Sequence, residues 1–550
     1  MQASGKSSLT RWMWLAAALL MLAEFLVFDR MTSRHHTGIY PRWNDQIQYL
    51  TEAYTAYEQM QAHGLAAGLK FSLGKTAVQG TLHDTFALFV FWLVGSASRS
   101  AALSLNMLAF LAWQAAVLFA IPRVSGSRAL GWMGFGLLLC VAWPWSGEAG
   151  SAVDFRLDHA AMCLMGVTSC VALLTNGFRS APWAVALGVA VGVTLLERFL
   201  TGIYFAAFFV ATAIWILMGE SRWARLRNLL LAGGVATTLA LPVFWINRTA
   251  IHTYYWVGHV SGAESDARFR GLDVWNSVSF VFGHLRDMHL GSYFGWVVVA
   301  LTALLLLLLA IFRPRPAAGP GRDWLYFAFA FLLVPAAVLV LHRQKSEYVL
   351  GVLVPGVILL ALWGWEMIRR RIAFPSTGHW SQYAALLPAL VAVSAGSNFF
   401  LQRQLHQPHD PGFLTSARTV NHIADTIFAS ARAHNVANPY IAVDQVVDYL
   451  DAQILQVICY ERKKIWVPFV IQLPNSILAE KEEVIFYRLQ LCDFVMLTDE
   501  MVGAGHWPYD QQMRRLYPEL KAWSDTHLRL VDTYAIFGRR ISLYQKKEMP

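Results

Sequence analysis

The chain has 550 residues, of which 56% are hydrophobic and only 14% are charged, and its formal net charge is +9. This composition departs from that of ordinary soluble globular proteins in the direction of membrane proteins, and it excludes the soluble class. The positive charge predicts no nucleic-acid partner, because basic loops beside membrane spans account for much of it.

Hydrophobic runs of about 20 residues, the length that crosses a bilayer, recur along the chain. The first run, from Trp12 to Phe28, follows a basic segment with Lys6 and Arg11. No small-residue cleavage site precedes Asp29, so we predict a retained anchor rather than a cleaved signal peptide. Further spans are predicted at 101–121, 129–145, 158–175, 182–196, 199–219, 228–246, 291–312, 323–342, 348–367 and 381–400.

The distribution of arginine between these spans predicts the topology. Four connectors are rich in arginine, and the positive-inside rule places all four in the cytoplasm. The apolar segment from Thr85 to Gly95 is too short to span, so we predict a helix at 84–97 lying on the outer membrane surface. The result is about eleven spans, a cytoplasmic N-terminus, and outer loops at 31–100 and 248–290. The first outer loop contains an amphipathic segment, 46–63, with Ile47, Leu50, Tyr54 and Tyr57 at helical spacing.

The sequence changes character near residue 402, where polar residues and prolines follow the last span. We therefore predict two domains, a transmembrane domain at 1–401 and an extracytoplasmic α/β domain at 402–550. Strands are predicted at 440–443, 465–470, 493–498, 528–533 and 541–544, and helices at 414–435, 445–460, 475–490 and 509–525. The pattern leaves open whether Cys459 and Cys492 form a disulfide.

Charged residues gather on the predicted outer side of the membrane. Charges near a bilayer are costly, so they are candidates for a functional site. Arginine and lysine can hold a phosphate, and a carboxylate can accept a proton from an acceptor hydroxyl or amine. Each residue also has a structural alternative: Arg198 as a salt-bridge partner, Lys345 as an ordinary loop cation, and Asp158 as a helix cap. The outer-side residues are Asp45, His83, Asp84, Glu148, Asp154, Arg156, Asp158, Glu197, Arg198, Arg343, Lys345, Glu347 and Tyr348.

Four short motifs resemble one known family. They are Trp43-Asn44-Asp45 after the first span, Gly80-Thr81-Leu82-His83-Asp84, Leu195-Leu196-Glu197-Arg198, and Gln344-Lys345-Ser346-Glu347-Tyr348 leading into Val354-Pro355. In these motifs the chain resembles the GT-C superfamily of polyprenyl-phosphate-sugar-dependent glycosyltransferases, near the protein mannosyltransferase and lipid A aminoarabinose transferase branch. The resemblance covers roughly residues 1–400, and the α/β tail is similar to the outer domain that many members carry. Many members have paired acids where this chain has Asn44-Asp45, and His-Pro-Pro where it has His83-Asp84.

The resemblance implies an inverting transfer of a sugar from a polyprenyl phosphate or pyrophosphate to a lipid, glycan or protein acceptor at the outer face of the membrane. It implies Asp45 as the general base and leaves open whether a divalent metal takes part. Arg198, Lys345 and Arg343 would hold the phosphate, and Asp154 and Asp158 would orient sugar or acceptor. Further contacts to substrate are expected from Arg42, His83, Asp84, Arg268, Arg270 and Tyr348.

Two other functions compete with a glycosyltransferase. A transporter or flippase of lipid-linked glycans would favour ionisable residues through the middle of the bilayer, whereas here the charges gather at one face. A non-catalytic envelope assembly protein would be favoured if Asp45, Arg198 and Lys345 were far apart. The exported tail predicts a multi-pass protein of the bacterial inner membrane.

Overall fold

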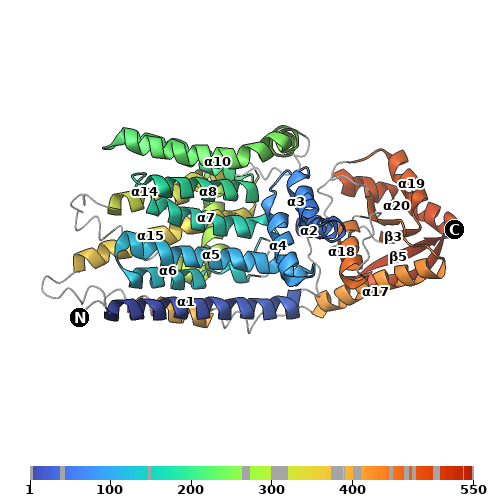
Figure 1. Ribbon diagram of the computed structural model, residues 1–550. Helices are drawn as coiled ribbons and strands as arrows, with labels where there is room; N and C mark the ends of the chain where they lie inside the picture. Colours follow the sequence, from blue (N-terminus) through green and yellow to red (C-terminus); the bar gives the residue numbers. More distant parts are fainter. Residues whose placement is uncertain are drawn as a thin grey trace. The chain divides into compact units, whose positions relative to one another are not determined.

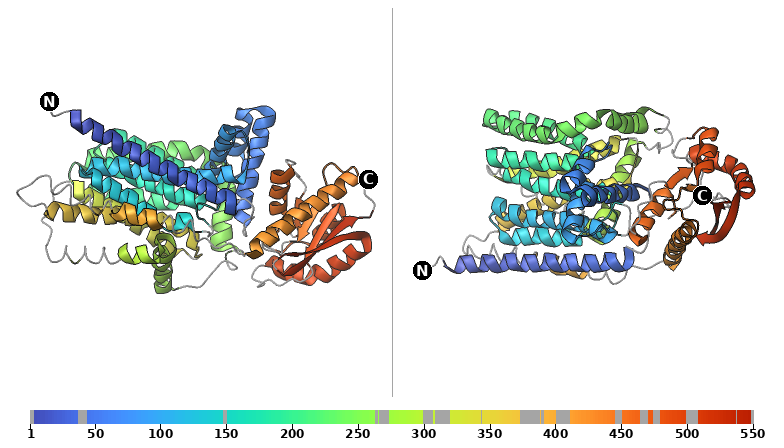
Figure 2. Two further views of the ribbon diagram at one scale, coloured as in Figure 1. Left: turned by 90° about the horizontal axis from the view of Figure 1, so that it is seen from below. Right: turned by 45° about the vertical axis from the view of Figure 1, so that its right-hand side comes forward.

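The structure, a computed structural model, describes residues 4–36, 44–146, 150–262, 265, 273–298, 307, 320–342, 344–372, 388, 391–399, 411–444, 450–463, 470–473, 479–498, 508–536 and 538–547. The chain divides into two compact units (Figures 1 and 2). The first, here the membrane unit, comprises Met1–Arg30, Gln59–Val94 and Ala101–Gln407. The second, here the sheet unit, comprises Met31–Glu58, Gly95–Ser100 and Pro408–Pro550.

The membrane unit is a bundle of apolar helices with short helices at one end (Figure 1). Its α-helices are α1 (Ser4–Met31), α3 (Leu65–Gly74), α4 (Leu82–Val94), α5 (Arg99–Ser125), α6 (Arg128–Cys140), α7 (Leu157–Leu174), α8 (Ala181–Glu197), α9 (Thr201–Leu217), α10 (Arg222–Ile251), α12 (Val274–His284), α14 (Pro320–Leu341) and α15 (Val354–Ile372). The unit also contains two 3₁₀ helices, η2 (Trp143–Trp145) and η5 (Glu347–Leu353), and two π-helices, η3 (His252–Ser261) and η4 (Leu285–Gly291).

Six of the described helical segments are long and apolar enough to cross a membrane. They are Trp12–Arg34, Arg99–Ser125, Leu157–Leu174, Arg222–Ser261, Gly321–Leu341 and Glu347–Met367. The spans predicted at 129–145, 182–196 and 199–219 correspond to the shorter helices α6, α8 and α9. Those predicted at 291–312 and 381–400 lie largely outside the described residues. A helical membrane protein is therefore confirmed, and the count of eleven spans stays a prediction.

The helix predicted at 84–97 is α4, which starts two residues earlier and has 13 residues. At 1.5 Å per residue it is about 20 Å long, which is too short for a hydrocarbon core of about 30 Å. Phe89, Trp92 and Leu93 near its C-terminal end are exposed. Helix α3 precedes it and contacts it, and Figure 1 shows both at one end of the bundle. The pattern did not predict α3.

Close helix contacts in the bundle depend on small residues. The best example joins α5 and α7, where a Cβ atom on Gly166 would lie 2.2 Å from the ring of Trp113. Trp113 is fully buried, so glycine at 166 is what allows the two helices to approach. This contact positions α7, whose first turn carries the candidate site residue Asp158.

The sheet unit contains a five-stranded sheet with strand order β2-β1-β3-β5-β4. Its strands are β1 (Ile441–Asp444), β2 (Val470–Leu473), β3 (Phe494–Thr498), β4 (Leu528–Ile536) and β5 (Arg539–Lys546). Strand β1 pairs in parallel with β2 and β3, whereas β5 pairs antiparallel with β3 and β4. Helices α17 (Pro411–Ala433), α18 (Ala452–Lys463), α19 (Glu482–Leu491) and α20 (Pro508–His527) complete the α/β arrangement, together with most of α2 (Asn44–His63) and η1 (Thr32–His36).

The alternation predicted for the tail is present. Strands β1, β3, β4 and β5 overlap their predicted ranges, while β2 begins at Val470, where the predicted strand ends. Residues 465–469 of that prediction lie outside the described residues. Cys459 and Cys492 are buried free thiols, so the structure contains no disulfide between them.

Candidate functional site

The site in the membrane unit begins with a backbone pairing between two segments far apart in sequence. The amide of Thr81 donates to the carbonyl of Leu196 at 2.8 Å, and the amide of Phe199 donates to the carbonyl of Gln79 at 2.7 Å. Between them, a Cβ atom on Gly80 would lie 2.0 Å from the carbonyl oxygen of Glu197. Only glycine therefore fits at position 80, and the pairing brings the start of α4 to the break between α8 and α9.

A buried acid–imidazole pair closes this junction. The Nδ1 atom of His83 lies 2.7 Å from Oε1 of Glu197, and each side chain is only 1% exposed. Beside it, Nζ of Lys75 lies 3.0 Å from Oδ2 of Asp84. Two of the predicted substrate contacts, His83 and Asp84, are thus paired with Glu197 and Lys75.

Arg198 lies at the end of α8 and joins α7 to the same junction. Its Nη2 atom is 3.0 Å from Oδ1 of Asp158, and its Nη1 atom donates to Oε1 of Gln79. Gln79 in turn donates to the hydroxyl of Tyr254 at 2.6 Å. Arg198 is therefore a salt-bridge partner, as its structural alternative predicted, and Asp158 is the carboxylate that it pairs with.

A second carboxylate, Asp154, is contacted by one main-chain amide and one arginine. Its Oδ2 atom accepts from the amide of Gly150 at 2.5 Å and lies 3.1 Å from Nε of Arg156. The side-chain amide of Asn106 donates to the carbonyl of Asp154 at 2.8 Å. The guanidinium of Arg156 lies 5.2 Å from the ring centre of Tyr348, so a predicted residue from the Gln344–Tyr348 motif reaches this group.

These pairs form one ionic cluster, because the rings of His83 and Phe155 are 4.3 Å apart and link the two halves. Its ionisable members are Lys75, His83, Asp84, Asp154, Arg156, Asp158, Glu197 and Arg198. Charges of both signs at the end of an apolar bundle can hold an anionic group and orient a polar one. His83, Asp84, Asp154, Asp158, Arg198 and Tyr348 thus lie in or beside this cluster, and their role as substrate ligands stays a prediction.

His289 supports the segment around Tyr348. Its Nε2 atom lies 2.8 Å from the carbonyl of Glu347, and its ring stacks 4.3 Å from that of Trp143. Burial lowers the pKa of His289 to about 4, so the ring is neutral near pH 7 and donates one hydrogen bond. Trp143 also donates to the carbonyl of Gly150 at 2.7 Å, which connects this support to Asp154.

Lys345 makes different contacts from those expected of a phosphate ligand. Its ammonium donates to the carbonyls of Leu339, Val340 and His342 at 3.0, 2.8 and 2.6 Å. Leu339 and Val340 lie in the last turn of α14 and His342 directly follows that helix, and a cation is favourable at a helix C-terminus. Burial lowers the pKa of Lys345. The role predicted for it in phosphate binding stays a prediction.

Asp45 belongs to the sheet unit and lies in the first turn of α2. Its side chain is exposed, whereas Ile47, Leu50, Tyr54 and Tyr57 on the same helix are buried, as the amphipathic pattern predicted. Four other predicted residues, Arg42, Arg268, Arg270 and Arg343, lie outside the described residues.

Sequence analysis missed Lys75, Gln79 and His289 as parts of the site. Lys75 and Gln79 had a signal, since both are polar residues within eight positions of the His83-Asp84 motif. His289 had none, because a single histidine at the end of a long loop has no characteristic spacing. Within the described residues, no group of three histidine, cysteine or acidic side chains is arranged to hold a metal ion.

Comparison with known proteins gives a fold but no sequence relative. No family model and no curated protein sequence matches this chain. The crystal structure of ArnT from Cupriavidus metallidurans in the apo state matches with a TM-score of 0.58 and 16% identity over 98% of both chains. ArnT bound to undecaprenyl phosphate matches with a TM-score of 0.57 and 15% identity, over 96% of this chain and 97% of ArnT.

The chain has the fold of ArnT. ArnT is a lipid A aminoarabinose transferase of the GT-C superfamily, so the resemblance predicted from the four motifs is confirmed at the level of the fold. The archaeal oligosaccharyltransferase AglB from Archaeoglobus fulgidus also matches, with a TM-score of 0.46 and 11% identity over 97% of this chain and 75% of AglB.

Proposed function

We propose that the chain is a membrane glycosyltransferase that moves a sugar from a polyprenyl-phosphate donor to an acceptor at the outer face of the membrane. The observation that carries the proposal is the ionic cluster around Arg198, at the end of a bundle whose fold is that of ArnT. One crystal structure of ArnT contains undecaprenyl phosphate, a donor carrier of this chemical class.

Arg198 is the proposed phosphate ligand. Two of its N–H groups are engaged by Asp158 and Gln79, and this anchoring fixes the direction of the guanidinium. The positive charge of the guanidinium would stabilise the charge that develops on the phosphate as it leaves. Arg343 and Lys345 are proposed as additional phosphate contacts, with Arg42, Arg268 and Arg270 as further contacts to substrate.

The lipid chain of the donor would occupy an apolar groove beside Arg198. The groove has a volume of about 630 Å³ and is lined by residues of α8, α9 and α10. Leu195, Gly202 and Phe244 are among its lining residues, and Phe244 packs 4.7 Å from Phe199, the residue after Arg198. An isoprenoid chain in this groove would bring its phosphate to the cluster.

The reaction would proceed with inversion at the anomeric carbon. An acceptor hydroxyl or amine would attack that carbon, its proton passing to the carboxylate of Asp45, while the bond to the phosphate oxygen breaks. Asp154 and Asp158 would orient the sugar or the acceptor, with His83, Asp84 and Tyr348 lining the site. The acceptor class is a lipid, a glycan or a protein.

The test is incubation of the purified full chain, in lipid, with a panel of polyprenyl-phosphate sugars and measurement of the polyprenyl phosphate released. Asp45→Asn should abolish release, because an amide cannot accept the proton. Glu52→Gln, which removes a carboxylate further along the same helix, should leave release unchanged. Full activity of Asp45→Asn would contradict the base assignment.

A transporter would behave differently in the same preparation. It would move a labelled lipid-linked glycan across the vesicle membrane without breaking the sugar–phosphate bond. A non-catalytic assembly protein would do neither.

A further inference from the structure

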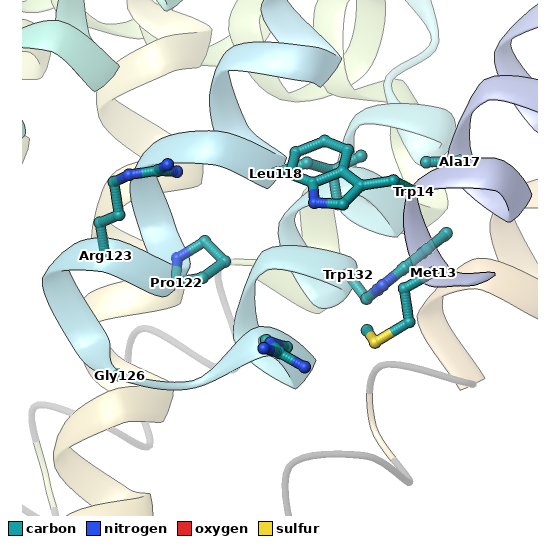
Figure 3. A pocket seen from close by; sticks show the side chains of 9 residues that line it. Met13, Trp14, Ala17, Leu118, Pro122, Arg123, Gly126 and Trp132 are labelled. Carbon is teal, nitrogen blue, oxygen red and sulfur yellow. The ribbon is translucent and has the colours of Figure 1, made fainter. Parts of the chain in front are cut away.

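A cavity of about 380 Å³ opens between α1, α5 and α6 of the membrane unit. Figure 3 shows Met13, Trp14 and Ala17 of α1 on one side, and Leu118, Pro122, Arg123 and Trp132 on the other. Gly126 and Arg128 complete the lining. None of these residues belongs to the ionic cluster or to the groove beside Arg198.

The cavity lies at the opposite end of the bundle from the ionic cluster. Helix α5 contacts the cluster through Asn106, which donates to the carbonyl of Asp154, and lines the cavity through Arg123. At 1.5 Å per residue these two positions are about 25 Å apart along the helix, close to the thickness of the hydrocarbon core. The cavity is therefore at the depth of the lipid headgroups in the other leaflet.

Two cations face this cavity. Arg123 and Arg128 are both exposed, and among the described residues neither is paired with a carboxylate. The Nη1 atom of Arg123 donates to the carbonyl of Phe119 at 2.8 Å, and its guanidinium lies 3.4 Å from the centre of the Phe119 ring. These contacts hold the side chain in place while its other N–H groups stay available to an anion.

The rest of the lining is apolar and aromatic. Trp14 is 45% exposed beside the cavity, and tryptophan is enriched at the level of lipid headgroups. Along α1, Leu20 and Met21 lie one turn beyond Ala17 on the same helical face, where Leu20 is exposed and Met21 packs beside Ala17 and Leu118, so the apolar surface continues from the cavity. An occupant with an anionic head and a hydrocarbon chain matches both parts.

We propose that this cavity binds an anionic glycerophospholipid of the leaflet opposite the ionic cluster. Its phosphate would contact Arg123 and Arg128 by charge-assisted hydrogen bonds, and an acyl chain would follow α1. Nothing in the proposed transfer reaction requires this lipid, so the proposal does not depend on the proposed function.

The test is titration of the delipidated full-length protein with phosphatidylglycerol, with bound lipid counted by native mass spectrometry. Arg123→Gln/Arg128→Gln should bind phosphatidylglycerol at least about tenfold more weakly, because two headgroup contacts are lost. The matched control is Arg222→Gln/Arg227→Gln, which removes two exposed arginines at the same end of the bundle but away from the cavity. This control should bind like the unaltered protein.

Three further arms distinguish the sources of the phosphate. Phosphatidylcholine, inorganic phosphate and undecaprenyl phosphate should each compete poorly for the site. Equal binding by the two double variants, or equal binding of phosphatidylcholine, would overturn the proposal. Competition by undecaprenyl phosphate alone would identify a second carrier site instead. The melting temperatures of the two double variants confirm that both are folded.

Discussion

Gly80 lies where α4 meets the break between α8 and α9, and this single position tests the geometry of the site. Gly80→Ala would place a methyl group 2.0 Å from the carbonyl oxygen of Glu197, so the paired segments must separate. Overpacking of this kind costs about 1–3 kcal/mol. We expect a lower melting temperature and loss of transfer activity, measured on the detergent-purified protein.

Gly74→Ala is the matched control for that substitution. Gly74 ends α3 only six residues earlier, and a Cβ atom there would have no neighbour within 4 Å. Alanine should be neutral or slightly stabilising because it restricts the unfolded chain. Equal effects of the two substitutions would show that the close approach at Gly80 does not hold the site together.

His289 predicts a pH dependence of stability. Burial lowers the pKa of His289 from 6.5 in the unfolded chain to about 4 in the folded protein. Between these two pH values the histidine is protonated in the unfolded chain but not in the folded protein. Protonation of His289 therefore does not change the free energy of unfolding above pH 6.5. As the pH falls from 6.5 to about 4, the free energy of unfolding decreases by up to about 3 kcal/mol.

The measurement is the melting temperature of the unaltered protein and of His289→Gln between pH 7.5 and 4.5. Glutamine can still donate to the carbonyl of Glu347 but does not titrate. The variant should lose less stability on acidification than the unaltered protein. Parallel curves would mean that His289 has an ordinary pKa.

At the scale of elements, periodicity predicted helices and strands well where one face is buried. The spacing of Ile47, Leu50, Tyr54 and Tyr57 predicted α2 because all four side chains face the same way into the sheet unit. Helix α3 was missed because it is only ten residues long and follows a glycine, Gly64, without a polar cap. The strand predicted at 465–470 meets β2 at Val470, and the pattern did not predict that the strand extends to Leu473, because short apolar strands carry no signal for their ends.

Helix α2 is fastened to α18 by two tyrosines whose hydroxyl groups donate to glutamates. Tyr54 donates to Glu461 at 2.6 Å, Tyr460 donates to Glu58 at 2.5 Å, and the two rings stack 5.0 Å apart. Burial, together with Glu58, raises the pKa of Tyr460, so its hydroxyl keeps the proton that it donates. The helix that carries Asp45 is thus held by the C-terminal part of the chain.

Replacing both tyrosines by phenylalanine should loosen α2 without emptying the core, because the rings remain. We expect faster amide hydrogen exchange over residues 44–58 and a lower transfer rate. Tyr487→Phe removes the hydroxyl of an exposed tyrosine on α19 and should change neither. Unchanged exchange in the double variant would rule out the tyrosines as the fastening.

At the scale of the whole molecule, the sequence predicted which residues lie at one end of the bundle but not how they pair. The arginine pattern placed Asp158 and Arg198 on one face, and they form an ion pair at 3.0 Å. The pairing itself depends on Gly80 and on the packing of α7, which no local pattern encodes. For Lys345, the positive charge led to the prediction of a phosphate contact. Its ammonium instead donates three hydrogen bonds to main-chain carbonyls at and just after the end of α14.

The same arginine pattern predicts on which side of the membrane each end of the chain lies. An odd number of spans puts the two termini on opposite sides of the membrane, and the positive-inside rule puts the N-terminus in the cytoplasm. Alkaline phosphatase fused after residue 550 should therefore be active, and green fluorescent protein fused there should be dark. Fusions truncated after Arg128 should give the reverse result, because that connector is predicted to be cytoplasmic. Fluorescence from the full-length fusion would instead require an even number of spans, and the first segment to reconsider would be α4, whose 13 residues would then have to cross a thinned bilayer.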